Sequence, residues 1–309
     1  MNPLVSIVTP SFNQGRYLRR TIESVLSQDY PQIEYVVLDG GSRDESVDIL
    51  RSYGDRLRWR SRPDRGQTDA INQGLAQARG DILAYLNSDD ILLPGAVSTI
   101  VAHMQANPEW DVVHGNARHI DENDLPLGDY PSAACTLQRM LQSCCICQPA
   151  AFWRRRVLER FGPFDDTLHY AMDYEYWLRL SCGGARFAHV SEMIAGSRLH
   201  EQTKTLSARL NVYREILAVS RRHAEDASFS QYYAYWHHRC HERASGWPRV
   251  FRLVPEGHWW LAYLHRRLFQ VRRALGRFGQ PVRAANVPPS GPAGIGVGSL
   301  SASPGDILY

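Results

Sequence analysis

Apolar segments that stop abruptly at polar turns recur through the first part of the chain, and stretches with helical spacing lie between them. The apolar segments are residues 4–9, 33–38, 82–86 and 112–115, residues 57–60 give a weaker strand pattern, and the helical stretches are 17–28, 44–53, 67–78 and 95–106. Continuous apolar strands that alternate with helices are typical of a mainly parallel sheet covered by helices on both faces. The sequence therefore predicts an α/β fold, in which ligands bind beyond the carboxyl ends of the strands.

Composition limits the kind of protein that this chain can be. With 309 residues, 44% of them apolar, it can bury a sizeable core in one large domain or two smaller ones. A net charge of +3 gives no general attraction for polyanions, so we expect no nucleic-acid partner. The six cysteines lack zinc-site spacing, and we expect buried, reduced thiols in a cytoplasmic protein. The sequence shows neither the pattern of a signal peptide nor a run of about 18 apolar residues, so we expect no spanning helix.

The pattern changes after about residue 117. Residues 118–135 read as a loop, and residues 136–200 alternate short strands and helices. We predict one domain over residues 1–205, followed by a helical, basic extension over 206–280. Residues 281–309 are rich in Pro, Gly, Ser and Ala, a composition typical of a disordered tail.

Three predicted strands end in polar signatures, at residues 9–13, 39–42 and 87–90. The last contains two adjacent carboxylates, Asp89 and Asp90, which repel each other unless a positive group lies between them. A hard divalent cation is the simplest candidate, because it prefers oxygen ligands and can also bind a phosphate. The alternative is a polar turn in which Asp90 caps the following helix.

Several motifs occur in an order that is specific as a set. They are residues 6–13 (SIVTPSFN), 21–25 (TIESV), 37–42 (VLDGGS), 64–74 (DRGQTDAINQG), 80–81 (GD), 86–90 (LNSDD), 173–178 (DYEYWL) and 198–200 (RLH). Over residues 3–205 the chain resembles the family 2 glycosyltransferases with the GT-A fold. The resemblance implies an inverting transfer from a UDP-, GDP- or dTDP-linked sugar to a glycan or lipid-linked acceptor, in cell-surface polysaccharide synthesis. It also implies a nucleotide-sugar half, 1–117, and an acceptor half, 118–205.

The resemblance places the donor nucleotide against the first strand ends. The residues concerned are Thr9, Pro10, Phe12, Asp39, Asp64, Arg65 and Asp69. Asp39 would contact the base, although a plain turn aspartate is the alternative. Residues 65–69 open a helix whose N-terminal amides favour phosphate groups. Asp69 serves equally well as a cap of that helix, and Pro10 as the end of the first strand.

The metal site is expected at Asn87-Ser88-Asp89, which occupies the D-x-D position of the family. Asparagine replaces the usual first aspartate, so Asp89 is expected to be the main metal ligand, with Asp90 as a further ligand. Asn87 and Ser88 are expected to contact the donor. By resemblance His200 completes the site, and an imidazole beside carboxylates suits Mn²⁺ at least as well as Mg²⁺. A surface-loop histidine is the alternative.

Lys204 is the single lysine among 35 basic residues. It lies four residues beyond His200, and we expect its ammonium group to stabilise the leaving diphosphate in a loop that closes over the donor. Chance retention of one lysine in an arginine-rich chain is the alternative.

Asp173 is expected to be the general base, because inversion requires a group that removes the acceptor proton during attack. Glu175 is the rival base, and Asp173 could also cap the helix that follows it. Gln148, Trp153 and Trp177 are expected on the acceptor side, with core packing as the alternative for Trp177.

Residues 259–278 combine leucines near one helical face with five arginines. This pattern is typical of an interfacial helix on an anionic membrane, which would place the protein at the inner face of the cell membrane. A helix that packs its apolar face on the domain and solvates its arginines is the alternative.

Two other functions fit parts of the sequence. A nucleotidyltransferase also combines an α/β sheet with carboxylate-bound metal, but it would normally carry a Gly-rich, basic loop after the first strand, and Phe12-Asn13-Gln14-Gly15 is neither. A catalytically degenerate carbohydrate-binding protein is conceivable because of Asn87.

Overall fold

The computed structural model describes residues 2–204, 208–224, 226–241 and 255–277. The chain divides into two compact units, Met1–Ala227 and Ser228–Tyr309, which are described separately. The boundary predicted at residue 205 assigns residues 209–223 to the extension, whereas the structure places them in the first unit. The tail predicted to be disordered, 281–309, lies outside the described residues.

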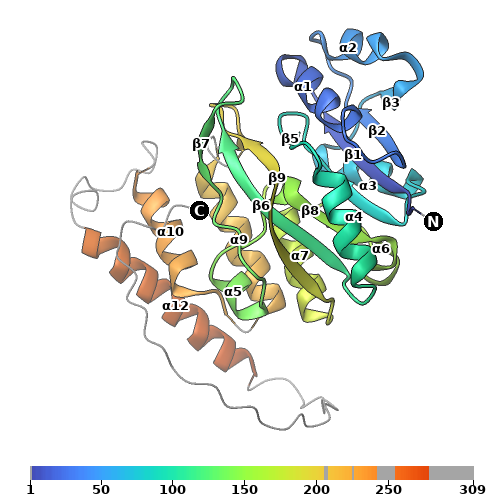
Figure 1. Ribbon diagram of the computed structural model, residues 1–309. Coiled ribbons are helices and arrows are strands. Elements are labelled where there is room, and N and C mark those ends of the chain that lie inside the picture. The colour runs from blue at the N-terminus through green and yellow to red at the C-terminus, as the bar shows by residue number, and fades with distance from the viewer. Residues whose placement is uncertain (1, 205–207, 225, 242–254, 278–309) are drawn as a thin grey trace. The chain divides into compact units, whose positions relative to one another are not determined.

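The first unit alternates strands and helices, as the sequence predicts (Figure 1). Its strands are β1 (Val5–Ser11), β2 (Ile33–Asp39), β3 (Arg58–Ser61), β4 (Ile82–Tyr85), β5 (Ile91–Leu92), β6 (Val112–Ile120), β7 (Pro126–Asp129), β8 (Ala151–Arg154) and β9 (Phe187–Arg198). Its α-helices are α1 (Gly15–Leu26), α2 (Ser46–Ser52), α3 (Gln67–Gln77), α4 (Ala96–Ala106), α5 (Leu137–Gln142), α6 (Arg155–Phe161), α7 (Met172–Cys182) and α9 (Arg209–His223).

All described strands join one nine-stranded sheet in the order β3-β2-β1-β4-β8-β6-β9-β5, with β7 paired to β6. The first four strands in this order are parallel, which confirms the predicted α/β arrangement. Beyond β4 the sheet is mixed, because β8 runs antiparallel to β4 and β6 while β6 and β9 are parallel. The carboxyl ends of β1, β2 and β4 therefore meet at one edge.

The segment predicted to be a loop, 118–135, contains regular structure. Strand β6 continues to Ile120 and pairs with β7 through a turn in which the Asp121 carboxylate accepts hydrogen bonds from the amides of Asn123 and Leu125. Strand β7 is exposed along its whole length. An exposed strand needs no apolar pattern, which is why the prediction of a loop was wrong here.

The two faces of the sheet bury separate cores. Ile7 of β1 packs in the core that includes Leu18 of α1 and Ile100 of α4. The next residue, Val8, faces the other way into the core that includes Ile71 of α3 and Trp177 of α7. Alternation along a single strand thus fixes which helices cover which face.

Two tryptophans expected on the acceptor side lie inside the second core. Trp153 and Trp177 are both 0% exposed, and their ring centroids are 5.9 Å apart. The expectation that they contact an acceptor is wrong for this geometry, because neither ring presents any surface. For Trp177 the core-packing alternative is the one observed.

Replacing Trp153 with Ala should lower the free energy of unfolding by about 3–5 kcal/mol, because a large cavity replaces the indole ring. Urea-induced unfolding measures the change. Leu127→Ala on exposed β7 is the control, with an expected change below about 0.5 kcal/mol. Similar small effects of both substitutions would contradict the buried placement of Trp153.

The cysteines are free, and they are not uniformly buried. Cys145, Cys147 and Cys240 are buried as expected, whereas Cys182 at the end of α7 is exposed. The expectation of buried thiols therefore fails at Cys182.

The second unit contains α10 (Phe229–His241) and α12 (Pro255–Arg277). Helix α12 turns His258 and Ala262 inward, and the ring of His265 lies 5.1 Å from that of Tyr232 on α10. In the part of the chain that the structure describes, no helix has both the length and the hydropathy needed to cross a bilayer.

Candidate functional site

The carboxyl ends of β1 and β2 are joined by a hydrogen-bonded turn built on Asp39. Its carboxylate is 2% exposed and accepts hydrogen bonds from the amides of Gly41 and Ser42 and from the hydroxyls of Ser42 and Ser61. Oδ1 accepts only the bond from the Ser42 hydroxyl, so one of its lone pairs remains. Asp39 thus organises this turn, which is the role of the turn aspartate named above as the alternative to contact with the base.

A glycine beside this turn admits a second carboxylate. A Cβ atom on Gly40 would lie 2.9 Å from Oδ2 of Asp64, so a larger residue would displace that side chain. The other oxygen of Asp64, Oδ1, accepts a hydrogen bond from the amide of Gly66. Asp39 and Asp64 therefore flank the same backbone, as expected for residues around one nucleotide.

The three residues predicted from the end of β1 differ in access. Thr9 is 0% exposed and its hydroxyl lies 3.0 Å from that of Tyr35, and Pro10 is also buried. Phe12 is 59% exposed. The phenyl ring of Phe12 is thus the side chain available to a ligand, and the expectation that Thr9 and Pro10 line an open pocket is not met here.

Arg65 and Asp69 form an ion pair at the start of α3. The Asp69 carboxylate accepts hydrogen bonds from the Arg65 guanidinium and amide and from the Gln73 side chain. The Arg65 hydrogen bonds and charge hold the pKa of Asp69 below its usual value. Arg65 also pairs with Asp166, so Asp69 holds the turn before α3 while the exposed Arg65 bridges two segments.

A chain of side-chain hydrogen bonds joins the predicted donor residues. Lys204 Nζ donates to Gln67 Oε1 at 2.6 Å, and Gln67 Nε2 donates to Asn87 Oδ1 at 2.6 Å. The Asn87 amide then donates to Asp90 Oδ2 and Gln148 Oε1. Asn87 therefore both accepts and donates, which a carboxylate in its place could not do.

Asp89 and His200 face each other across the end of β4. Oδ2 of Asp89 lies 3.0 Å from Nε2 of His200, and His200 is only 6% exposed. Both groups can ligate a divalent cation, so the pair fits the predicted metal site. Among the described residues no group of three His, Cys, Asp or Glu side chains forms a ready ligand set.

Asp90, predicted as a further ligand, is occupied otherwise. It is 4% exposed, and its oxygens accept hydrogen bonds from the Arg198 amide and the Asn87 side chain. Burial, together with the neighbouring charge of Asp89, raises its pKa to about 8. Asp90 is thus engaged in holding the turn.

Arg198 was missed as a site residue, although it belongs to the quoted RLH motif. Its side chain is buried, and the guanidinium donates to the carbonyl oxygens of Asp89 and Asp121 and pairs with Asp124. A buried guanidinium with this many carbonyl partners is not readable from one sequence, because its partners come from distant turns.

A polar cavity of about 320 Å³ opens beside His200. Its lining comes from the start of α1, the start of α2 and the turns on either side. The residues are Asn13, Gln14, Arg16, Tyr17, Asp44, Glu45, Glu122, His200, Glu201 and Gln202. The cavity thus reaches His200, whose ring lies 4.8 Å from the Tyr17 ring.

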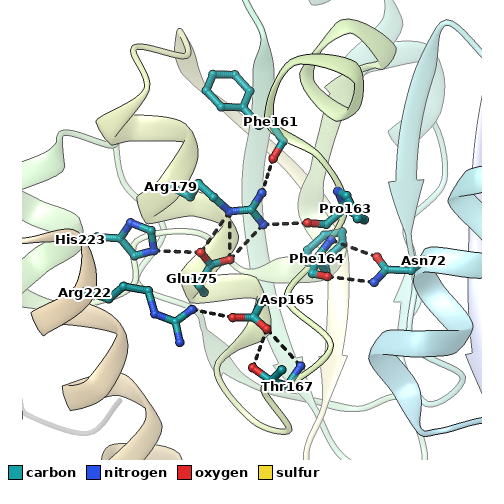
Figure 2. A network of polar contacts seen from close by, with 10 residues as sticks. All are labelled: Asn72, Phe161, Pro163, Phe164, Asp165, Thr167, Glu175, Arg179, Arg222 and His223. Carbon is teal, nitrogen blue, oxygen red and sulfur yellow. Dashed lines mark hydrogen bonds and ion pairs between the residues drawn. The ribbon is translucent and has the colours of Figure 1, made fainter.

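The two candidate bases on α7 have different surroundings. Asp173 is partly exposed, and burial raises its pKa. Glu175 is 2% exposed, and its oxygens accept hydrogen bonds from Arg179 and lie against His223 of α9 (Figure 2). Burial alone would raise the pKa of Glu175, but the interactions with His223 and Arg179 hold it below its usual value. Glu175 is thus a buried link between α7 and α9.

The sequence and the fold of this chain are similar to those of known proteins. The model of the family described as glycosyl transferase family 2 matches residues 6–162, about half of the chain. This chain belongs to glycosyltransferase family 2. An uncharacterized glycosyltransferase of Rickettsia typhi is 27% identical over 225 residues, 67% of each chain. The protein is therefore an enzyme, a glycosyltransferase, and not a nucleotidyltransferase.

Solved structures support the GT-A fold of this glycosyltransferase. The crystal structure of S. aureus TarS residues 1–349 with UDP-GlcNAc has a TM-score of 0.59 at 20% identity, covering 84% of this chain and 79% of that one. The mannosyltransferase PcManGT of Pyrobaculum calidifontis, in complex with GDP-Man and Mn²⁺, has a TM-score of 0.54 at 15% identity, covering 91% and 77%. At these identities the likeness concerns the fold.

Glu175→Gln should destabilise the glycosyltransferase by about 2 kcal/mol at neutral pH, because Arg179 loses a charged partner in a buried place. Since the folded-state pKa of Glu175 is depressed, its contribution is present above the ordinary value of 4.5 and is lost as the pH falls below it. The difference in the free energy of unfolding between wild type and variant, measured by urea-induced unfolding, should therefore become smaller toward pH 3. Glu159→Gln, at an exposed position on α6, is the control. A difference in unfolding free energy that does not depend on pH would contradict the ion pair between Glu175 and Arg179.

Proposed function

We propose that this glycosyltransferase moves a sugar from a nucleotide-diphosphate sugar to a hydroxyl group of a glycan or lipid-linked acceptor, with inversion at the anomeric carbon. The observation that carries the proposal is the pairing of Asp89 with His200 at 3.0 Å, at the end of β4 and beside an open polar cavity. The complexes of TarS with UDP-GlcNAc and of PcManGT with GDP-Man support this class of donor. The proposed context is synthesis of a cell-surface polysaccharide or glycolipid.

Asp89 and His200 would hold a divalent cation, Mn²⁺ or Mg²⁺. When bound, such a cation stabilises the negative charge that develops on the leaving diphosphate. The Mn²⁺ in the PcManGT complex supports this proposal. Asp90 is not included, because its oxygens are taken by the Arg198 amide and Asn87.

Lys204 adds positive charge on the same side. Burial lowers its pKa, while the charge of Asp89 acts in the opposite direction. Its hydrogen bond to Gln67 aims it at the chain that leads to Asn87. We assign it to the departing diphosphate, and Ser88, buried beside Asp89, to the turn that carries the metal ligands.

The nucleotide would lie against the ends of β1 and β2. Phe12 offers an exposed ring for stacking on the base, and the remaining lone pair of Asp39 Oδ1 can accept a base N–H. Asp64 and Arg65 border the same edge.

Asp173 is the proposed general base. It is the second residue of α7 and is partly exposed. A pKa raised by burial makes the carboxylate a better proton acceptor in the attack of the acceptor hydroxyl. Glu175 lacks this freedom, because Arg179 and His223 occupy it. We also propose that Gln148, which is hydrogen-bonded to Asn87 and to the Tyr85 carbonyl, lies on the acceptor side of the site.

Asp173→Asn should abolish turnover while nucleotide binding survives, because the amide cannot take the proton. The donor is first chosen by thermal shift with UDP-GlcNAc, GDP-mannose and dTDP-glucose in the presence of Mn²⁺. Release of nucleoside diphosphate from the chosen donor then measures turnover, with water as acceptor. We expect at least a ~100-fold loss for Asp173→Asn with an unchanged thermal shift.

Asp89→Ala is the contrasting variant. It should lose the Mn²⁺-dependent part of the thermal shift as well as turnover, whereas Lys204→Ala should lower turnover with metal binding retained. Full activity of Asp89→Ala would overturn the proposal that Asp89 binds the metal ion. Full activity of Asp173→Asn would overturn the assignment of Asp173 as the general base.

We also propose that α12 binds an anionic membrane surface. Its face opposite Ala262 exposes an apolar stripe, namely Trp260, Leu264, Leu268 and Val271, which are 53–60% exposed. Exposed Arg267 and Arg272 border this stripe, and no acidic residue follows Glu256 in the helix. Apolar side chains flanked by arginines suit the headgroup boundary of anionic lipids.

Leu264→Glu combined with Leu268→Glu should reduce binding to phosphatidylglycerol-containing vesicles at least ~10-fold, because each leucine buried in the interface contributes about 2 kcal/mol. Co-sedimentation of the full-length protein measures this. Leu127→Glu, on exposed β7, is the control with the same chemical change. Equal sedimentation of all variants, or equal binding to vesicles of phosphatidylcholine alone, would contradict the proposal.

A further inference from the structure

A glutamate of α9 covers the start of the helix that carries Asp173. Oε1 of Glu215 accepts a hydrogen bond from the His169 amide at 3.0 Å, and Oε2 accepts from the amides of Tyr170 and Ala171 at 2.8 and 2.9 Å. Ala171 is the N-cap of α7 and has no capping side chain of its own. Free amides at a helix N-terminus need acceptors, and a carboxylate there also complements the helix dipole. Glu215, from a distant part of the sequence, meets this need for the N-cap amide of Ala171 and also holds the two amides that precede it.

The segment before α7 is held from two sides. On the α3 side, Asn72 exchanges two hydrogen bonds with the backbone of Phe164, and Thr68 donates to the Leu168 carbonyl. On the α9 side, Arg222 pairs with Asp165 (Figure 2). Residues 164–171 therefore connect the donor half of the sheet to α7, and Glu215 closes the end nearest the helix.

The position of this cap matters because Asp173 is the second residue of α7, two residues beyond Ala171. We infer that Glu215 is a positioning residue, which fixes the first turn of α7 and thereby the Asp173 carboxylate relative to the end of β4. This inference rests on the proposed role of Asp173 as the base. It also makes α9, which lies beyond the match to the family model, a part of the catalytic machinery.

A second contact links the cap to the donor side. Lys204 Nζ lies 3.4 Å from the His169 carbonyl oxygen, while Glu215 holds the amide of the same residue. The charge of Glu215 also favours the ammonium form of Lys204. One peptide segment thus connects the cation proposed for the leaving group with the helix of the proposed base.

The test compares Glu215→Ala and Glu215→Gln with Arg214→Ala, an exposed neighbour on α9 whose guanidinium bonds to Asn211. Release of nucleoside diphosphate from the donor chosen by thermal shift is measured at several pH values, with Mn²⁺. We expect Glu215→Ala to lower kcat about 10- to 100-fold with KM for the donor changed less than about twofold, because a small misplacement of a catalytic group is costly. Glu215→Gln, which keeps one acceptor oxygen, should fall between Glu215→Ala and wild type, and Arg214→Ala should match wild type.

The pH profile separates positioning from simple support of the fold. Loss of the Glu215 charge and greater hydration of Asp173 both favour the ionised base, so the acid limb of kcat should move down by about half a pH unit in Glu215→Gln. Hydrogen exchange over residues 165–172 should also become faster in this variant. If Glu215→Ala does not fold, the isosteric Glu215→Gln decides.

Two outcomes would overturn the inference. Unchanged kcat and acid limb in the Glu215 variants, with Asp173→Asn inactive, would leave the proposed function standing and remove the role of Glu215. A fall in kcat with the acid limb unmoved would make Glu215 merely structural. If Asp173→Asn itself is active, the base assignment fails first, and with it the foundation of this inference.

Discussion

The buried guanidinium of Arg198 is the interaction on which the arrangement of the site depends. Placing a charge where 1% of the residue is exposed is costly unless hydrogen bonds and an opposite charge compensate it. Here the carbonyl oxygens of Asp89 and Asp121 and the carboxylate of Asp124 do so. Because Arg198 ends β9 and its amide donates to Asp90, this single residue joins the turn after β4 to the turn after β6, and His200 follows two residues later in the chain.

The asparagine in the D-x-D position becomes understandable from its neighbours. Asn87 accepts from Gln67 and donates to Asp90 and Gln148. An aspartate in this position would add a negative charge beside Asp89 and the buried Asp90 and would lose both donated bonds. The departure from the family pattern is thus consistent with a side chain that links the donor and acceptor sides, while the ligand role falls to Asp89.

The sequence predicted the parallel half of the sheet and the family, because both depend on local patterns. Residues 82–86 are a continuous apolar run and residues 33–38 are apolar apart from Glu34, and β4 and β2 lie there. It did not predict what depends on contacts between distant segments. Burial of Trp153 is decided by Phe164 and Tyr176, and the role of Glu175 by His223, 48 residues away. The sequence did not predict strand β7, because an exposed strand has no apolar pattern.

The bonds between α9 and the segment before α7 also bear on how such enzymes can recombine. The family model ends at residue 162, before both Asp173 and Glu215. A gene exchange with its breakpoint there would bring in α7 and α9 from the same parent and keep the cap matched to its helix. A breakpoint between residues 182 and 209 would join α7 of one parent to α9 of another, and the three amides before α7 would then depend on a chance partner. Lineages that diversify by exchange should therefore inherit α7 and α9 as one block.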